Sequence, residues 1–158
     1  MSRILAIDPG PERSAYIIVD ETGTPDSAVF GIATNGELLL WLRETKREGA
    51  THLVIEQVAS YGMPVGADVF ETVYWSGRFA EASRPLPMQR IPRKAVVTHL
   101  CGSARAKDSN VRQALIDRFG GKERAIGRKA APGPLYGIHA DLWAALAVAV
   151  TWADQQVA

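Results

Sequence analysis

The sequence has one cysteine, no long apolar run and almost no net charge. Cys101 is the only cysteine among 158 residues, which excludes an internal disulfide framework and a cysteine-rich zinc site and indicates a reducing compartment. The longest apolar run, Leu142 to Trp152, is about half of the roughly 20 residues that a membrane-spanning helix needs. The N-terminal residues lack the basic start and apolar stretch of a secretory leader. We therefore expect a cytoplasmic protein with no membrane partner.

The composition is that of an ordinary globular protein, with 47% apolar and 22% charged residues. We expect residues 1–158 to form one domain with its own core. The net charge of +1 conceals an asymmetry, since residues 84–130 contain twelve Lys/Arg and three Asp/Glu, whereas residues 1–83 contain six and twelve. Such segregation suits a protein that binds a polyanion with one face, although a solvated basic face without a partner is the alternative.

Periodicity and turn residues predict a mixed α/β layer fold. Three leading strands form an antiparallel meander, and helices then alternate with two further strands. The region 120–137 is rich in glycine, proline and basic residues, and we expect it to be mobile until bound. The predicted strands are 2–8, 16–19, 27–33, 51–58 and 85–91. The predicted helices are 35–49 (with Leu38, Leu39, Leu42 and Thr45 on its apolar face), 67–83, 92–101, 108–119 (capped by Asp108 or Ser109) and 138–157.

Three acidic residues stand at the ends of apolar elements. Asp8 closes the first strand, Glu56 closes Leu53-Val54-Ile55, and Asp141 opens the last apolar helix. Carboxylates at the ends of adjacent strands repel one another unless a cation neutralises them, and Mg²⁺ prefers carboxylate and phosphate oxygens. Alone, Asp8 could be a turn former and Asp141 a helix cap. Together, the three acids predict a metal-dependent enzyme that acts on phosphates.

The motifs occur in the order found in one family. They are Ile7-Asp8-Pro9-Gly10, Ile55-Glu56-Gln57, the region around Lys94 and Lys107 to Leu115, and His139-Ala140-Asp141-Leu142-Trp143-Ala144-Ala145-Leu146-Ala147. On these residues the chain resembles the RuvC family of Holliday junction resolvases, in particular its compact phage-type members. The resemblance implies a ribonuclease H-like five-stranded mixed sheet flanked by helices.

The resemblance also implies an active site with two Mg²⁺ ions roughly 4 Å apart, in which Mn²⁺ also supports activity. Asp8 would bind both ions, Glu56 one and Asp141 the other. The family's fourth acid would fall at Ala144, so His139 either replaces it or helps to position or protonate the leaving group. Lys107, at the scissile phosphate, completes the catalytic set.

Further residues are candidates for contact with DNA. Lys94 and Arg112, with Lys107, are expected at phosphates, and Tyr61 and Met63 lie where the family carries an apolar wedge near the junction centre. Four residues of the glycine-rich region could close over a DNA arm or could serve solubility alone: Lys122, Arg124, Arg128 and Lys129. The four tryptophans are expected in the core or a subunit interface: Trp41, Trp75, Trp143 and Trp152.

Resolving a four-way junction takes two symmetric cuts, which implies a two-fold homodimer. The helix 67–83 carries more aromatic residues than one buried face requires (Phe70, Tyr74, Trp75 and Phe79), so we expect it at the dimer interface. A wholly buried helix in a monomer is the alternative.

The expected function is that of a crossover junction endodeoxyribonuclease acting on branched DNA in recombination and repair. The alternatives are a related nuclease acting on other branched DNA or on RNA–DNA hybrids, and a catalytically silent junction-binding protein. A nuclease of either kind would be nucleoid-associated, and a phage or prophage could encode it. The sequence does not specify a branch-migration motor as partner.

Overall fold

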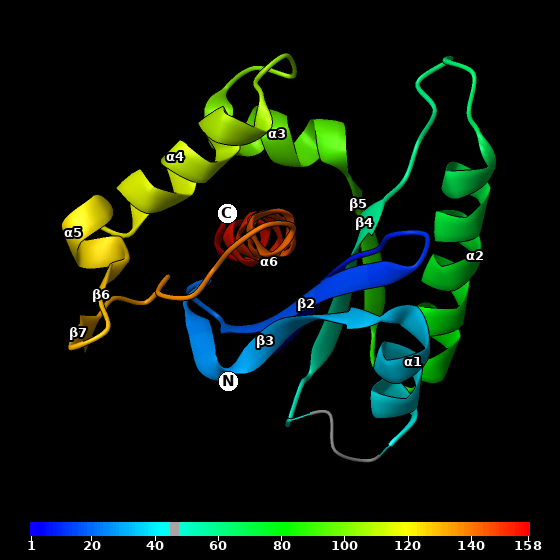
Figure 1. Cartoon of the computed structure of the whole chain (residues 1–158), viewed down its shortest axis with the longest axis horizontal. Coiled ribbons are helices and arrows are strands. Elements are labelled where there is room, and N and C mark those ends of the chain that lie inside the picture. The colour runs from blue at the N-terminus through cyan, green and yellow to red at the C-terminus, as the bar shows by residue number, and fades with distance from the viewer. Residues whose placement is uncertain (45–47) are drawn as a thin grey trace.

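A computed structural model of the chain describes residues 1–44 and 48–158 (Figure 1). At its centre is a five-stranded sheet in the order β3-β2-β1-β4-β5. The β1–β2 and β2–β3 pairs are antiparallel, whereas β1–β4 and β4–β5 are parallel. The strands are β1 (Arg3–Asp8), β2 (Arg13–Asp20), β3 (Pro25–Thr34), β4 (His52–Gln57) and β5 (Met88–Pro92). The expectation of a ribonuclease H-like mixed sheet flanked by helices is confirmed, with β1 in the central position.

The central strand is buried on both faces. Ile4 and Ala6 pack into one apolar core, Leu5 and Ile7 into the other, and all four are fully buried. Successive side chains of a strand point to opposite faces, so an uninterrupted apolar run is what a doubly covered strand requires.

Helices cover both faces of the sheet (Figure 1). The core beneath α1 (Asn35–Arg43) and α2 (Ala67–Ala82) lies on one face. The other core contains residues of α3 (Arg93–Cys101), α4 (Asp108–Arg118) and α6 (Leu142–Val157). Within the described ranges, no helix is both long enough and apolar enough to cross a bilayer.

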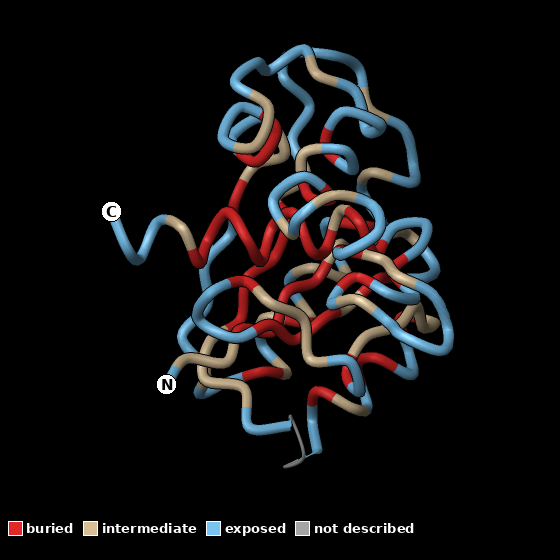
Figure 2. Tube along the Cα trace, turned by 90° about the vertical axis from the view of Figure 1, so that its left-hand side faces the viewer, coloured by how far each residue is buried: buried red, intermediate tan, exposed pale blue. Residues whose placement is uncertain are grey.

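The last helix is enclosed on nearly all sides. Positions 142–143 and every position from 145 to 153 of α6 are buried, because α6 packs against β1 and β2 on one side and α3 and α4 on the other. Figure 2 shows this buried stretch in red, leading towards the C-terminus. A helix that is apolar all round needs such enclosure.

This helix begins at Leu142, and the prediction of a start at residue 138 is wrong. Ala140 has a left-handed backbone with φ of 48°, which is incompatible with a continuing right-handed helix. A turn precedes the helix, in which the Leu142 N–H donates to the His139 carbonyl at 3.0 Å. Asp141 is thus placed at the N-cap, outside the regular helix.

Residues 120–137 are ordered by packing, contrary to the expectation of a loop that orders only on binding. They form α5 (Lys122–Ala125) and a small hairpin of β6 (Gly127–Arg128) and β7 (Ala131–Pro132). Leu135 is 1% exposed and anchors the segment in the core. At Gly133, an added Cβ would lie 2.2 Å from the Arg124 carbonyl oxygen, so only glycine permits this approach.

Several predicted boundaries are also corrected. The edge strand β5 begins at Met88, three residues after the predicted start, and α4 begins at Asp108 with Lys107 as its N-cap, so neither Asp108 nor Ser109 caps it. The helix α1 ends at Arg43, short of the predicted residue 49. The predicted apolar position Thr45 lies outside the described residues.

Candidate active site

Asp8 and Glu56 lie side by side at one edge of the sheet. β1 and β4 are parallel neighbours whose pairing runs to Ile7 and Ile55, each directly before an acidic residue. Parallel strands end at the same edge, so their terminal side chains meet there, and Glu56 is only 9% exposed. The expectation that these two carboxylates come together is met.

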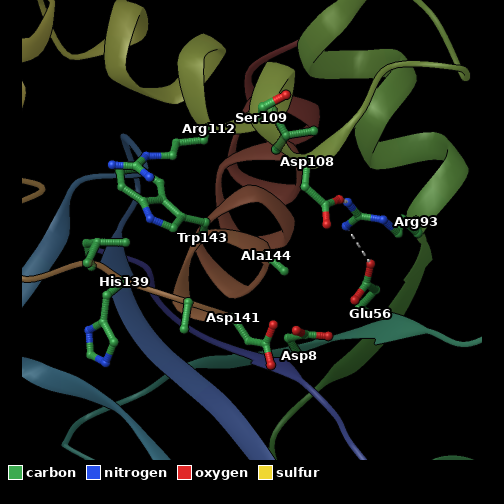
Figure 3. A pocket seen from close by; sticks show the side chains of 13 residues that line it. Asp8, Glu56, Arg93, Asp108, Ser109, Arg112, His139, Asp141, Trp143 and Ala144 are labelled. Carbon is green, nitrogen blue, oxygen red and sulfur yellow. Dashed lines mark hydrogen bonds and ion pairs between the residues drawn. The ribbon is translucent and has the colours of Figure 1, made fainter.

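Asp141 approaches the pair from α6. Figure 3 shows its carboxylate facing that of Asp8. Burial, a hydrogen bond shared with Glu56, and repulsion from Glu56 and Asp141 together raise the pKa of Asp8 to about 10, against an ordinary value of 3.8. A carboxyl in this position needs a proton or a cation close by.

The loop after Asp8 is fixed by a buried polar network. The Gly10 N–H donates to Ser14 Oγ at 3.1 Å, and the Ser14 hydroxyl donates to Asn35 Oδ1 at 2.6 Å. Asn35 Nδ2 in turn donates to the Gly10 carbonyl at 2.9 Å. This closed set of bonds holds the strand end that presents Asp8.

Arg93 is the main site residue that the sequence analysis missed. Its Nη1 lies 3.3 Å from Glu56 Oε1, and its Nη2 forms a close ion pair with Asp108 Oδ1 (Figure 3). Burial alone would lower the pKa of Arg93, but attraction to Glu56 and Asp108 outweighs it and raises the pKa above its ordinary value. Arg93 directly follows β5, and it reaches Glu56 because β5 pairs in parallel with β4.

These residues line a cavity of about 600 Å³. Arg112 also lines it, with its guanidinium carbon 5.0 Å from the centre of the Trp143 ring, a cation–π distance. His139 lies at the rim with Nδ1 2.9 Å from the Gly137 carbonyl oxygen, and its imidazole is turned away from the carboxylates (Figure 3). Ala144, one turn after Asp141, lines the cavity but has no side-chain atom that could bind a metal ion.

The possible metal ligands in the cavity are carboxylate oxygens without sulfur, and such ligands suit a hard divalent cation. Burial, and then the hydrogen bond and repulsion from neighbouring carboxylates, raise the pKa of Asp8, so its charged form is unfavourable without a counter-charge. Among the described residues, however, no three or more His, Cys, Asp or Glu side chains are already grouped to hold one metal ion. The ion pair with Arg93 engages Glu56. The residues therefore fit Mg²⁺ in kind, and the carboxylates would have to close further around it.

The fold has counterparts among solved structures. The structure of Thermus thermophilus RuvC in complex with a Holliday junction substrate matches with a TM-score of 0.69 and 16% identity, covering 96% of this chain and 92% of that one. A second Thermus thermophilus RuvC structure matches with a TM-score of 0.66 and 17% identity, covering 98% and 96%. This protein has the RuvC fold. No protein-family model and no curated protein matches the sequence.

Within this RuvC fold, the loop after β4 and the start of α3 are in contact. Tyr61 and Met63 lie in that loop and are 56% and 69% exposed. The Tyr61 hydroxyl accepts a hydrogen bond from the Lys94 backbone N–H at 3.2 Å, so it satisfies one free donor at the N-terminus of α3. Tyr61 is thus exposed next to the start of α3, where Arg93 lies, and Met63 is exposed in the same loop.

The other candidate DNA contacts lie outside the cavity. Lys107 precedes Asp108 as the N-cap of α4, and Lys94 is exposed on α3. The four basic residues of the 120–137 region belong to α5 and the hairpin, at the opposite end of α4 from α3 (Figure 1). Trp143 and Trp152 are buried in the core as expected, whereas Trp41 and Trp75 are partly buried.

Proposed function

We propose that this protein is a divalent-metal-dependent endonuclease that resolves four-way DNA junctions by paired symmetric nicks. The observation that carries the proposal is the convergence of Asp8, Glu56 and Asp141 at one edge of the sheet. It is supported by the fold shared with a RuvC that was solved with a Holliday junction substrate. Such an enzyme would act on DNA in the cytoplasm, in recombination or repair.

Asp8, Glu56 and Asp141 would hold two Mg²⁺ ions, and Mn²⁺ would substitute. The bound ions would activate water and relieve the leaving oxygen of charge. Lys107, at the N-terminus of α4, suits a phosphate contact, because free backbone N–H groups also gather there. His139 Nε2 remains available for a proton, since Nδ1 faces the Gly137 carbonyl.

Basic residues of three elements would track the DNA backbone. Lys94 belongs to α3, Arg112 to α4 and Arg128 to the hairpin, and α3 and α4 cover the same face of the sheet. Exposed Tyr61 and Met63 would pack against unpaired bases at the junction centre, where base stacking contributes about 1–3 kcal/mol. Lys122, Arg124 and Lys129 would contact an arm farther out.

The helix α2 would form the dimer interface. Phe70, Val73 and Tyr74 are 66%, 49% and 58% exposed on this helix, and exposed apolar side chains grouped on one helix suit a protein–protein contact. Arg78 stacks between Tyr74 and Trp75, with its guanidinium carbon 5.4 and 4.4 Å from their ring centres. A two-fold dimer would give each junction two active sites.

The test is a gel assay with synthetic four-way junctions, each labelled on one strand, with Mg²⁺ or with EDTA. We expect symmetric Mg²⁺-dependent nicks in opposite strands. Asp8→Asn should bind the junction as the unmodified protein does and cut nothing, because the amide cannot hold the cations. Glu21→Gln, which changes an exposed carboxylate in the β2–β3 turn, is the matched control and should cut normally.

Two observations favour a second candidate, a catalytically silent junction-binding protein. Ala144 supplies no carboxylate to the cavity, and Arg93 already neutralises Glu56. Tight junction binding with no cleavage in Mg²⁺ or Mn²⁺ would select this candidate. Cleavage of forks or RNA–DNA hybrids in preference to four-way junctions would instead indicate a related nuclease.

A further inference from the structure

Arg93 joins two carboxylates that differ in their surroundings. The Glu56 side chain is 11% exposed and is fixed at the end of a central strand, whereas the Asp108 side chain is 90% exposed at the first turn of α4. One side of the guanidinium is therefore anchored inside the cavity. The other side is held only by a carboxylate that water can replace.

The cavity has more acidic than basic side chains in its lining. Four carboxylates line it (Asp8, Glu56, Asp108 and Asp141), and the arginines among its lining residues are Arg93 and Arg112. Arg112 lies over the Trp143 ring, whereas Arg93 lies directly beside the carboxylate pair. Arg93 Nη2 can donate to a phosphate oxygen as well as to a carboxylate oxygen.

We propose that Arg93 binds a DNA phosphate and that Asp108 occupies the phosphate's place on the guanidinium until DNA arrives. This inference rests on the proposed function, since it assumes a DNA substrate. DNA binding exchanges one anion for another on Nη2, while the bond from Nη1 to Glu56 keeps the guanidinium oriented. Releasing the Asp108 carboxylate into solvent costs little free energy, because this side chain is already exposed.

The experiment measures junction affinity in EDTA by fluorescence anisotropy, so that neither metal nor cleavage contributes. Arg93→Gln should weaken binding by about tenfold, the worth of one charge-assisted contact, and should lower the slope of log affinity against log salt by about one. Asp108→Asn should tighten binding by about threefold, because the competing anion is gone. Arg93→Lys, which keeps the charge and loses the fork, should fall between the unmodified protein and Arg93→Gln.

The decisive measurement is the double variant. If Asp108 acts by occupying Arg93, then Asp108→Asn has no effect once Arg93 is glutamine. Asp117→Asn is the matched control, since it removes a carboxylate from the exposed side of the same helix, where Asp117 accepts a hydrogen bond from Gln113 at 2.8 Å. Its effect should be small and the same with or without Arg93.

Equal tightening by Asp108→Asn in both backgrounds would overturn the proposal, because Asp108 would then act by general repulsion. Unchanged affinity of a folded Arg93→Gln variant would overturn it as well, and if that variant fails to fold, unchanged affinity of Arg93→Lys does so. The expected pattern in a protein that cuts no branched DNA would refute the proposed nuclease while supporting this inference. Cleavage of branched DNA without this pattern of affinities would support the proposed nuclease and refute this inference.

Discussion

Asp8 is a buried carboxyl whose nearest ionisable neighbours include two further carboxylates. Because its pKa is about 10 in the folded chain and 3.8 ordinarily, the folded state binds more protons than the unfolded state between these values. The free energy of unfolding therefore falls as the pH rises through that interval. The ionised form of Asp8 therefore costs stability unless a cation compensates its charge.

Asp8→Asn should consequently stabilise the metal-free protein. At mildly alkaline pH we expect a gain of at least ~1 kcal/mol in the free energy of unfolding, since each unit of pKa shift corresponds to about 1.4 kcal/mol. Denaturant unfolding in EDTA across neutral and alkaline pH measures this. The decline with pH should flatten in the variant, and Mg²⁺ should stabilise the unmodified protein more than the variant. Parallel pH profiles would contradict the assignment.

At the scale of elements, Asp154 ties three helices together. On α6, Asp154 Oδ2 lies 2.7 Å from His99 Nε2 on α3 and 2.7 Å from Arg118 Nη1 on α4. Burial raises the pKa of Asp154, but the bonds from Arg118 and His99 outweigh it, so that the pKa lies below its ordinary value. This contribution to stability is present above the ordinary pKa of 3.8 and is lost as the pH falls below it.

Asp154→Asn should lower the free energy of unfolding by about 1–3 kcal/mol at neutral pH, because Arg118 and His99 both lose their charged acceptor. The difference between the variant and the unmodified protein should shrink in acid as Asp154 becomes protonated. Thermal melts at several pH values measure it. A difference that stays constant down to acid pH would show that packing, and not charge, is responsible.

The packing of the β6–β7 hairpin against α5 depends on Gly133. An added Cβ would lie 2.2 and 2.3 Å from the carbonyl oxygens of Arg124 and Ala125, so Gly133→Ala should displace α5 and cost about 1–3 kcal/mol. Gly36→Ala in α1 is the control, because nothing lies within 4 Å of that position. Hydrogen exchange should show loss of protection in 120–137 for the first variant alone. Unchanged protection would mean that this segment tolerates a larger separation.

At the scale of the whole molecule, the helices on the two faces of the sheet carry different kinds of exposed residues. The helices α3 and α4 cover one face, and α1 and α2 cover the other (Figure 1). The first side carries Arg93 and Arg112 of the cavity lining, whereas α2 carries the exposed Phe70 and Tyr74. DNA binding and self-association would then use opposite layers. This division makes the proposed dimer compatible with two accessible active sites.

Charging the α2 face should abolish the dimer. Tyr74→Glu with Phe70→Glu should convert a dimer into a monomer in light scattering after size exclusion, because paired glutamates would face their copies in an apolar contact. Tyr136→Glu, at another partly exposed aromatic residue outside α2, should leave the mass unchanged. A monomeric unmodified protein at micromolar concentration would remove the basis for this interface.

Local patterns in the sequence were sufficient for the central elements. The apolar run before Asp8 and the second run before Glu56 identified β1 and β4, because strands covered on both faces must be apolar throughout. The expectation that both acids lie close together came from their positions at strand ends, and the parallel pairing of β1 with β4 explains why they do. In contrast, the start of α6 could not be read from periodicity, because Ile138 continues the apolar pattern while Ala140 breaks the helix through its backbone alone.

What the sequence by itself determined was which residues had to be buried and which acids would stand at strand ends, since both depend on local pattern. Only the tertiary structure decided what meets those acids: Arg93, distant from Glu56 in the chain, reaches it because β5 lies beside β4. The conformation of residues 120–137 likewise depends on tertiary packing, because Leu135 is buried in the core and Gly133 lies against the carbonyl oxygens of Arg124 and Ala125. Pairings between separate elements depend on chain topology, which no local pattern encodes.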